Sequence, residues 1–184
     1  MTQPDLTTAC EVLHRGGVIA YPTEAVWGLG CDPENSAAIQ RILELKQRPV
    51  AKGLIVVAAD IDQIGQLIDP LTSTQKNQLV TTWPGSVTWL IPDPREIFST
   101  WVRGEHKSVA VRVSAHPLVQ QLCREFGKPI ISTSANIAGQ PEIRDRSELV
   151  ASFAETIDCI TPGELGGSSA VSEIRDLLSG KILR

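Results

Sequence analysis

The chain has 184 residues, of which 42% are hydrophobic and 21% charged, and its formal net charge is −4. These values predict one globular domain over residues 1–184 and disfavour a broadly basic nucleic-acid-binding protein, although a local basic groove is compatible with them. No apolar stretch approaches the ~20 residues of a membrane-spanning helix, the first ten residues lack a basic start followed by an apolar run, and the four cysteines form no Cys-x-x-Cys motif. We therefore expect a cytoplasmic protein with no membrane contact, no signal peptide and reduced thiols.

Short apolar runs rich in β-branched residues alternate with segments of helical period, starting with a buried strand over 17–21. A helix follows over 36–48, capped by Asn35 or Ser36 and stopped just before Pro49, because proline restricts the preceding residue to extended geometry. From there the pattern predicts, in chain order, a strand over 53–58, helices over 61–68 and 74–83, strands over 86–91 and 108–113, a helix over 117–126, a strand over 129–132, a helix over 146–155 and a strand over 157–160.

The tail, 170–184, holds two short apolar segments around Ser179 and Gly180, which is typical of a hairpin. Alternating strands and helices predict an α/β fold in which helices flank a single twisted sheet. The long connection over 92–107 and the hairpin indicate antiparallel pairs, so the sheet should be mixed. No internal repeat or linker interrupts the pattern.

The sequence lacks the motifs of several common kinds of site. It has no Gly-x-x-x-x-Gly-Lys-Ser/Thr phosphate loop, no Gly-x-Gly-x-x-Gly and no Gly-x-Ser-x-Gly nucleophile elbow. Its three histidines, His14, His106 and His116, are spread along the chain without metal-ligand spacing. An enzyme with this sequence is therefore expected to position charged substrates, with neither a covalent nucleophile nor a protein-held metal.

Polar residues stand at the ends of the predicted strands, where the ligands of α/β sheets collect. Thr23 follows the first strand, and its hydroxyl either holds a small polar ligand or bonds its own turn. Lys46, Arg48 and Lys52 surround the end of a predicted helix. Cations at that position interact favourably with the helix dipole, which is the simpler explanation, and they also suit a clamp on a triphosphate.

Arg112 lies in the otherwise apolar strand over 108–113. A buried arginine without a partner is very costly. Arg112 must therefore meet a carboxylate, which belongs either to the protein or to a ligand.

Two further polar segments follow. The strand over 129–132 runs into a group of hydroxyl and amide side chains, namely Ser132, Thr133, Ser134 and Asn136. Such groups hydrogen-bond phosphate or a nucleobase, or else satisfy their own turn. The loop over 166–169, with Ser172 beyond it, either lets a ligand approach its glycines or is a plain flexible loop.

Six motifs in this order resemble the threonylcarbamoyl-AMP synthase family, also called YrdC-like domains. They read YPTEAVWGLG at 21–30, LKQRPVAKGLIVV at 45–57, WPGSVTWLIP at 83–92, SVAVRV at 108–113, PIISTSANIAGQP at 129–141, and SEIRD with GKILR near the end. They cover nearly the whole chain, whose length resembles the short bacterial form.

The resemblance implies a nucleotidyltransferase that converts L-threonine, bicarbonate and ATP to threonylcarbamoyl-AMP and pyrophosphate, with Mg²⁺ accompanying the nucleotide. It also implies a separate tRNA threonylcarbamoyl transferase complex, which passes the threonylcarbamoyl group to N6 of adenosine 37 in tRNAs that read codons starting with A.

The resemblance also implies roles for single residues. The residues expected to bind threonine are Thr23, Arg112, Ser132 and Ser172. Those expected to bind the nucleotide are Lys46, Arg48, Lys52, Ser108, Ser134, Asn136 and Arg184, and Lys46 and Arg48 are also expected to act in catalysis through the phosphates.

Two other functions were weighed against this one. Similar domains occur in hydrogenase-maturation carbamoyltransferases, which are much larger and carry zinc-finger and acylphosphatase segments that this chain lacks. A non-enzymatic module that binds double-stranded RNA, tRNA or the ribosome would show a steep loss of affinity with salt. The net negative charge favours the enzyme.

Overall fold

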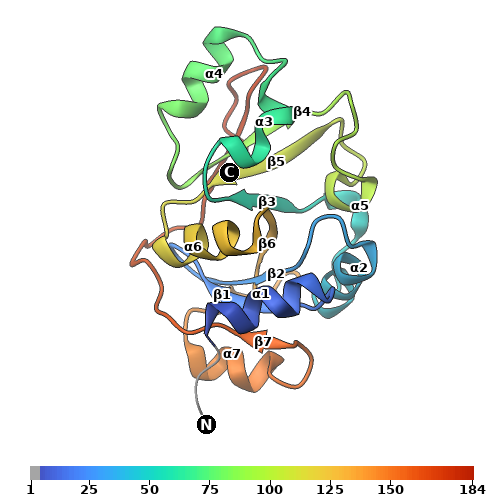
Figure 1. The fold of residues 1–184 in the computed structure, drawn as a ribbon, viewed down its shortest axis with the longest axis vertical. Coiled ribbons are helices and arrows are strands. Elements are labelled where there is room, and N and C mark those ends of the chain that lie inside the picture. Colours follow the sequence, from blue (N-terminus) through green and yellow to red (C-terminus); the bar gives the residue numbers. More distant parts are fainter. Residues whose placement is uncertain (1–4) are drawn as a thin grey trace.

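The computed structural model describes residues 5–184. Residues 1–4, which belong to the start of the chain where no signal peptide is expected, lie outside the described part. The described residues form one eight-stranded sheet (Figure 1) with the strand order β7-β1-β2-β6-β3-β5-β4-β8. Its strands are β1 (Ile19–Pro22), β2 (Trp27–Gly30), β3 (Ile55–Ala58), β4 (Val87–Pro92), β5 (Ser108–Val113), β6 (Ile130–Ser134), β7 (Cys159–Ile160) and β8 (Glu173–Asp176).

The predicted mixed sheet is confirmed. Neighbours pair in parallel at β1–β7, β3–β5 and β4–β8, and in antiparallel fashion at β1–β2, β2–β6, β3–β6 and β4–β5. The predicted hairpin in the tail is also present, since Arg175 pairs with Ile182 and Gly180 takes a φ of 70° in the turn. The expectation of one domain over 1–184 stays a prediction.

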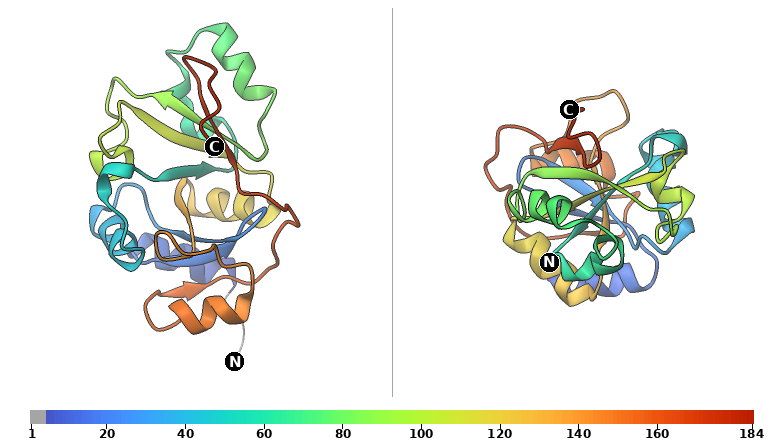
Figure 2. Two further views of the ribbon diagram at one scale, coloured as in Figure 1. Left: turned by 180° about the vertical axis from the view of Figure 1, so that it is seen from behind. Right: turned by 90° about the horizontal axis from the view of Figure 1, so that it is seen from above.

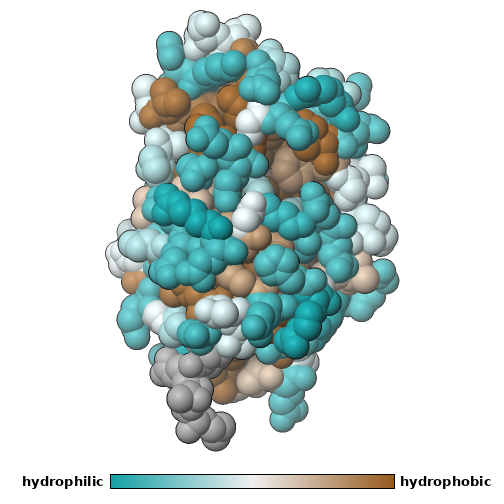
Figure 3. All heavy atoms as spheres, in the orientation of Figure 1, coloured by the Kyte–Doolittle hydropathy of each residue, from teal (hydrophilic) through white to brown (hydrophobic). Residues whose placement is uncertain are grey.

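Helices flank the sheet. They are α1 (Leu6–His14), α2 (Ser36–Leu45), α3 (Gly65–Ile68), α4 (Ser73–Val80), α5 (Thr100–Arg103), α6 (Pro117–Phe126) and α7 (Arg146–Phe153), with 3-10 turns at η1 (Val50–Lys52) and η2 (Asp62–Ile64). The helices α1 and α6 lie side by side on one face of the sheet (Figure 1). That face is mostly hydrophilic on its outside (Figure 3), as expected of amphipathic helices that bury one side.

Side-chain alternation along the strands builds a core on each side of the sheet. In β1, Ile19 and Tyr21 pack with α1 and α6, whereas Ala20 packs with the larger cluster that contains Ile39 and Ile42 of α2. The C-terminal hairpin lies on the face opposite α1 and α6 (Figure 2). This arrangement leaves the second face of β3, β5 and β6 partly uncovered by helices, beneath the hairpin.

Some predicted boundaries are wrong. The helix predicted over 36–48 ends at Leu45, because Lys46 caps it and Gln47 adopts a φ of 49°, outside the helical region. The strand predicted over 129–132 continues to Ser134, where it pairs with Gly28 of β2. The sequence pattern did not predict α1, β2 or α5.

Candidate active site

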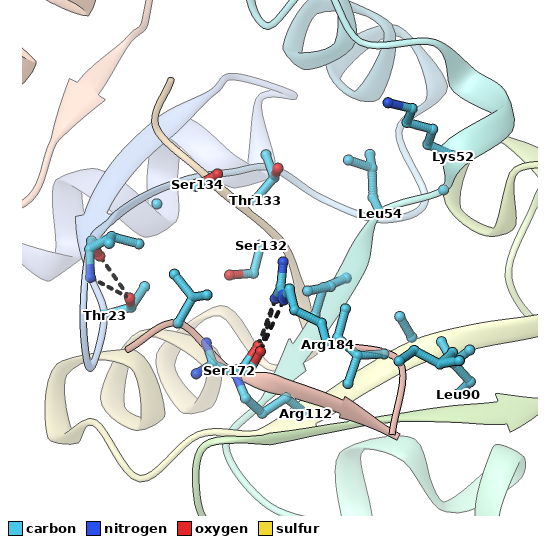
Figure 4. Close-up of a pocket in the computed structure, with 18 of the residues that line it drawn as sticks. Thr23, Lys52, Leu54, Leu90, Arg112, Ser132, Thr133, Ser134, Ser172 and Arg184 are labelled. Carbon is cyan, nitrogen blue, oxygen red and sulfur yellow. Dashed lines mark hydrogen bonds between the residues drawn. The ribbon is translucent and has the colours of Figure 1, made fainter. Parts of the chain in front are cut away.

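A cavity of about 350 Å³ is lined by residues of β3, β5 and β6 and of the C-terminal hairpin. Nine of the eleven residues predicted to form the site line it: Thr23, Arg48, Lys52, Ser108, Arg112, Ser132, Ser134, Ser172 and Arg184. The other two, Lys46 and Asn136, do not line it. The segments that line the cavity are far apart in sequence (Figure 4). They meet because β6, β3 and β5 are neighbours in the sheet.

Thr23 stands at the turn between β1 and β2 and is buried. Its hydroxyl donates to the main-chain oxygen of Val26 at 2.7 Å and accepts from the Val26 nitrogen at 3.4 Å. The hydroxyl therefore closes its own turn, one of the two readings left open by the sequence, and the residue also faces the cavity.

Arg112 of β5 meets a carboxylate, as its place in an apolar strand requires. Its Nη1 donates to Glu24 Oε2 at 2.7 Å, and the two side chains are only 8% and 14% exposed. The Arg112 guanidinium and the Ser114 hydroxyl hold the pKa of Glu24 below its usual value, although burial alone would raise it. The carboxylate that the sequence required is therefore supplied by the protein, at a residue which was not assigned to the site.

Lys46 is almost completely buried, is not part of the cavity lining, and its ammonium is surrounded by oxygens. Its Nζ donates to the main-chain oxygen of Ser134, to the main-chain oxygen of Asn136 at 2.8 Å and to Asn136 Oδ1 at 2.9 Å. Burial, followed by the nearby positive charge of Arg48, lowers the pKa of Lys46 to about 8. The ammonium holds the loop that follows β6.

The same loop is fixed by its own side chains. The Ser134 hydroxyl donates to Asn136 Oδ1 at 2.6 Å, and Asn136 Nδ2 donates to the Gln140 oxygen at 2.6 Å. Ser132 and Ser134, two residues apart on β6, both line the cavity. Strand β6 thus presents hydroxyl groups to the cavity, and Asn136 of the following loop accepts the hydrogen bond of the Ser134 hydroxyl.

Arg48 and Arg184 bring positive charge to the cavity from distant parts of the chain. Arg48 donates through Nε and Nη2 to the Gly53 oxygen, at 3.3 and 3.0 Å. Arg184 donates through the same two atoms to the Ser172 oxygen, at 3.2 and 3.0 Å (Figure 4). Burial lowers the pKa of both residues, and repulsion by Arg184 adds to the shift of Arg48. Arginine stays protonated in proteins, so these two side chains bring two positive charges to the cavity.

Other lining residues were not predicted. Glu24, Glu142 and His106 add titratable groups, and apolar side chains form part of the wall: Leu54, Leu90, Val102, Ile174 and Leu183. Only Glu24 had a usable signal, since it follows Thr23 directly and Arg112 demanded a carboxylate. Within residues 5–184 there is no cluster of three or more His, Cys, Asp or Glu that suits a metal ion. No helix in this part of the chain is both long and apolar enough to span a membrane.

Comparison with known proteins identifies the family. The profile of the Sua5/YciO/YrdC family, described as "Telomere recombination", matches residues 11–184. A protein of Stenotrophomonas maltophilia named threonylcarbamoyl-AMP synthase is 49% identical over the full length of both chains. A protein of the same name from Pseudomonas aeruginosa is 54% identical over 96% of this chain and 94% of its own.

Solved structures agree in fold. The crystal structure of P. abyssi Sua5 complexed with L-threonine has a TM-score of 0.89 and 30% identity over 97% of this chain, which spans about half (53%) of that longer protein. The crystal structure of E. coli YciO has a TM-score of 0.82 at 24% identity and covers 95% of this chain and 87% of its own. This chain belongs to the Sua5/YciO/YrdC family.

Proposed function

We propose that this chain is an L-threonylcarbamoyladenylate synthase, which forms threonylcarbamoyl-AMP and pyrophosphate from L-threonine, bicarbonate and ATP. The observation that carries the proposal is one cavity in which Arg48, Arg112 and Arg184 converge beside the hydroxyls of β6. A fourth lining arginine, Arg103, pairs with Asp93 and Glu96. The other three suit a ligand set with several negative charges, and ATP with an amino-acid carboxylate is such a set. The names of relatives about 50% identical over nearly the whole chain support this choice.

The reaction joins three substrates in one cavity. Bicarbonate loses water on its conversion to the carbamate: the threonine amine adds to the carbon of CO2, formed by dehydration of bicarbonate, and loses a proton. A carbamate oxygen then attacks the α-phosphorus of ATP, and pyrophosphate leaves with the electron pair of the broken P–O bond. Holding the reactants together lowers the barrier by removing the cost of bringing them into register.

The chain's own residues supply charge and position. Arg48, Arg184 and Lys52 stabilise the phosphates and the charge that develops on pyrophosphate, and Ser108 and Ser134 hydrogen-bond the nucleotide. Arg112 pairs with the threonine carboxylate, alongside Thr23, Ser132 and Ser172. ATP enters as its magnesium complex, so the metal arrives with the substrate.

Lys46 and Asn136 were predicted to contact the nucleotide directly. Such contact by Lys46 would require its ammonium to leave three oxygen acceptors. We therefore propose that both residues act by fixing the loop that follows β6, and with it the position of Ser134 at the end of that strand.

Glu24 is unsuited to the role of general base. Its Oε2 accepts from Arg112 and its Oε1 from Ser114 and the Ala115 nitrogen, and its pKa lies below the usual value. The amine of threonine is therefore expected to lose its proton to bicarbonate or solvent.

The product serves tRNA in this proposal. A separate transferase complex would carry the threonylcarbamoyl group to adenosine 37, which places the enzyme in the cytoplasm. The test is pyrophosphate release by the purified chain with L-threonine and bicarbonate each present or omitted. Release that needs both supports the synthase, whereas release with neither, or none at all, contradicts it.

A further inference from the structure

We propose that Glu24 is a positioning residue, which fixes Arg112 against the cavity before the amino-acid carboxylate arrives. The inference rests on the proposed function for the identity of that carboxylate, L-threonine. It assigns a task to an acidic residue that sits, against simple charge complementarity, in a cavity built for anions.

The Glu24 carboxylate joins three segments of the chain. Its Oε2 accepts from Arg112 Nη1 at 2.7 Å, at the end of β5. Its Oε1 accepts from the Ser114 hydroxyl at 2.7 Å and from the Ala115 nitrogen at 3.1 Å, in the turn that leads to α6. Both oxygens are therefore occupied by donors that lie on the side of β5, and the carboxylate has one preferred orientation.

The main chain of Glu24 is held as well. Its oxygen accepts from the Ser168 nitrogen at 2.8 Å, and the oxygen of Thr23 accepts from the Gly166 nitrogen at 3.0 Å. The Thr23 hydroxyl closes the turn on the other side of Glu24. Because both ends of the side chain are anchored, Glu24 is a rigid support for Arg112 and not a flexible counter-ion.

Arg112 retains hydrogen-bonding capacity after this pairing. Its side chain is 92% buried, and Nη1 has the Glu24 oxygen, while Nε has no hydrogen-bond partner among the described residues. A buried N–H without a partner is costly, so the protein alone leaves the Arg112 guanidinium incompletely satisfied. Figure 4 shows Arg112 gathered with Ser132, Ser172 and Arg184, so a carboxylate that pairs with Arg112 lies among groups able to bind its other atoms.

A pair that is formed in advance has a definite kinetic consequence. The ordering of a long arginine side chain is completed during folding, so threonine does not have to bear that cost on binding. Loss of Glu24 should then weaken the binding of L-threonine and leave the binding of ATP unchanged, because the contacts proposed for ATP come from Arg48, Arg184 and Lys52. A merely structural ion pair would instead lower stability and affect both substrates alike.

The variant Glu24→Gln keeps the size of the side chain and one oxygen acceptor but removes the charge. We expect the KM for L-threonine to rise at least about 10-fold while the KM for ATP stays within about 2-fold. Glu24→Asp, which restores charge on a shorter arm, should recover part of the loss. The matched control is Asp158→Asn, which removes the charge of a carboxylate that pairs with Arg41 and accepts from the Val18 nitrogen outside the cavity.

The test that distinguishes positioning from a merely structural role is whether the effect of Glu24→Gln on the threonine KM depends on Arg112. Once Arg112 is replaced by Ala, adding Glu24→Gln should change the threonine KM by less than about 2-fold, since residues that act through one another are not additive. If Glu24→Gln fails to fold, Ser114→Ala removes one donor from the same carboxylate at unchanged charge. It should also raise the threonine KM selectively, by a smaller factor.

Calorimetric binding of L-threonine, measured on the same proteins, separates this inference from the proposed function. Wild-type protein that binds threonine but releases no pyrophosphate would overturn the synthase, while a weaker titration of Glu24→Gln would still support the positioning role. Equal threonine affinity in wild type and Glu24→Gln, or an equal rise in both KM values, would overturn the positioning role alone. Wild-type protein that neither binds threonine nor turns over would overturn both.

Discussion

The ammonium of Lys46 lies 2.8 Å from the main-chain oxygen and 2.9 Å from the side-chain oxygen of Asn136, ninety positions later in the chain. The Ser134 oxygen is its third acceptor. One buried cation thus ties the end of α2 to the loop that follows β6. It thereby fixes Ser134, the last residue of β6, at the cavity. Lys46, which the sequence suggested as a phosphate ligand, therefore supports the cavity without lining it.

This arrangement predicts a pH effect. The pKa of Lys46 is lowered to about 8, so the residue loses its charge and one of its three donor hydrogens as the pH rises through that value. The loop should then loosen, and the KM for ATP should rise above pH 8. In Lys46→Arg, whose side chain stays charged, the ATP KM should be flat over the same pH range.

Lys46→Met serves as the limiting case for that prediction. It removes every donor and should show the raised ATP KM at all pH values. A wild-type pH profile that matches the profile of Lys46→Arg, measured with the same threonine concentration, would contradict the role of Lys46 titration. Using one substrate mixture for both proteins cancels the titration of threonine itself.

Arg48→Ala should lower kcat by about 100-fold or more, because a preorganised donor on developing phosphate charge typically contributes that much. The measurement is steady-state pyrophosphate release at saturating ATP. Arg41→Ala is the matched control, since Arg41 lies in α2, shortly before Arg48 in the chain, and pairs with Asp158 outside the cavity. Near-normal turnover of Arg48→Ala would remove Arg48 from the mechanism.

Arg184→Ala should raise the KM for ATP by about 10-fold, the effect of losing one charge-assisted contact, with little change in melting temperature. Lys181→Ala removes an exposed cation from the same hairpin, outside the cavity lining, and should leave both substrates unaffected. A fall in melting temperature that fully accounts for lost activity would show that Arg184 only holds the hairpin through Ser172.

Gly30→Ala should destabilise the fold by about 1–3 kcal/mol, the usual cost of forcing extra volume into a packed interior. A Cβ at Gly30 would lie 2.7 Å from the Ile131 oxygen and 2.7 Å from the Tyr21 ring. Gly65→Ala has open space around the new methyl and should be neutral or slightly stabilising. Chemical denaturation of both variants checks the difference, and equal stabilities would contradict the packing of β2.

The same glycine shows where sequence reasoning stopped. Strand β2 reads Trp-Gly-Leu-Gly, and glycine is poor in strands, so its pattern did not suggest one. The strand forms because β1 and β6 pair with it on either side, and the close packing leaves no space for a side chain at Gly30. Tertiary packing overrides propensity there, and no local pattern carries that information.

Arg112 shows the opposite case. A cation in an apolar strand required a carboxylate on physical grounds, and the structure supplies Glu24. The position of Glu24 beside Thr23 was a signal for that carboxylate, but the sequence could not show that the two residues pair. Their pairing depends on the turn after β1 and the end of β5 meeting at one sheet face. Lys46 was harder still, since the sequence contains no sign that its acceptors would be main-chain oxygens of a distant loop.

The most direct test of the central claim follows the carbon of bicarbonate. Purified protein is given ATP, L-threonine and ¹³C-labelled bicarbonate without any RNA, and the adenylate product is analysed by mass spectrometry. The account predicts threonylcarbamoyl-AMP that carries one labelled carbon, formed in step with pyrophosphate. An adenylate without the label, or formation of the product only when RNA is added, would contradict it.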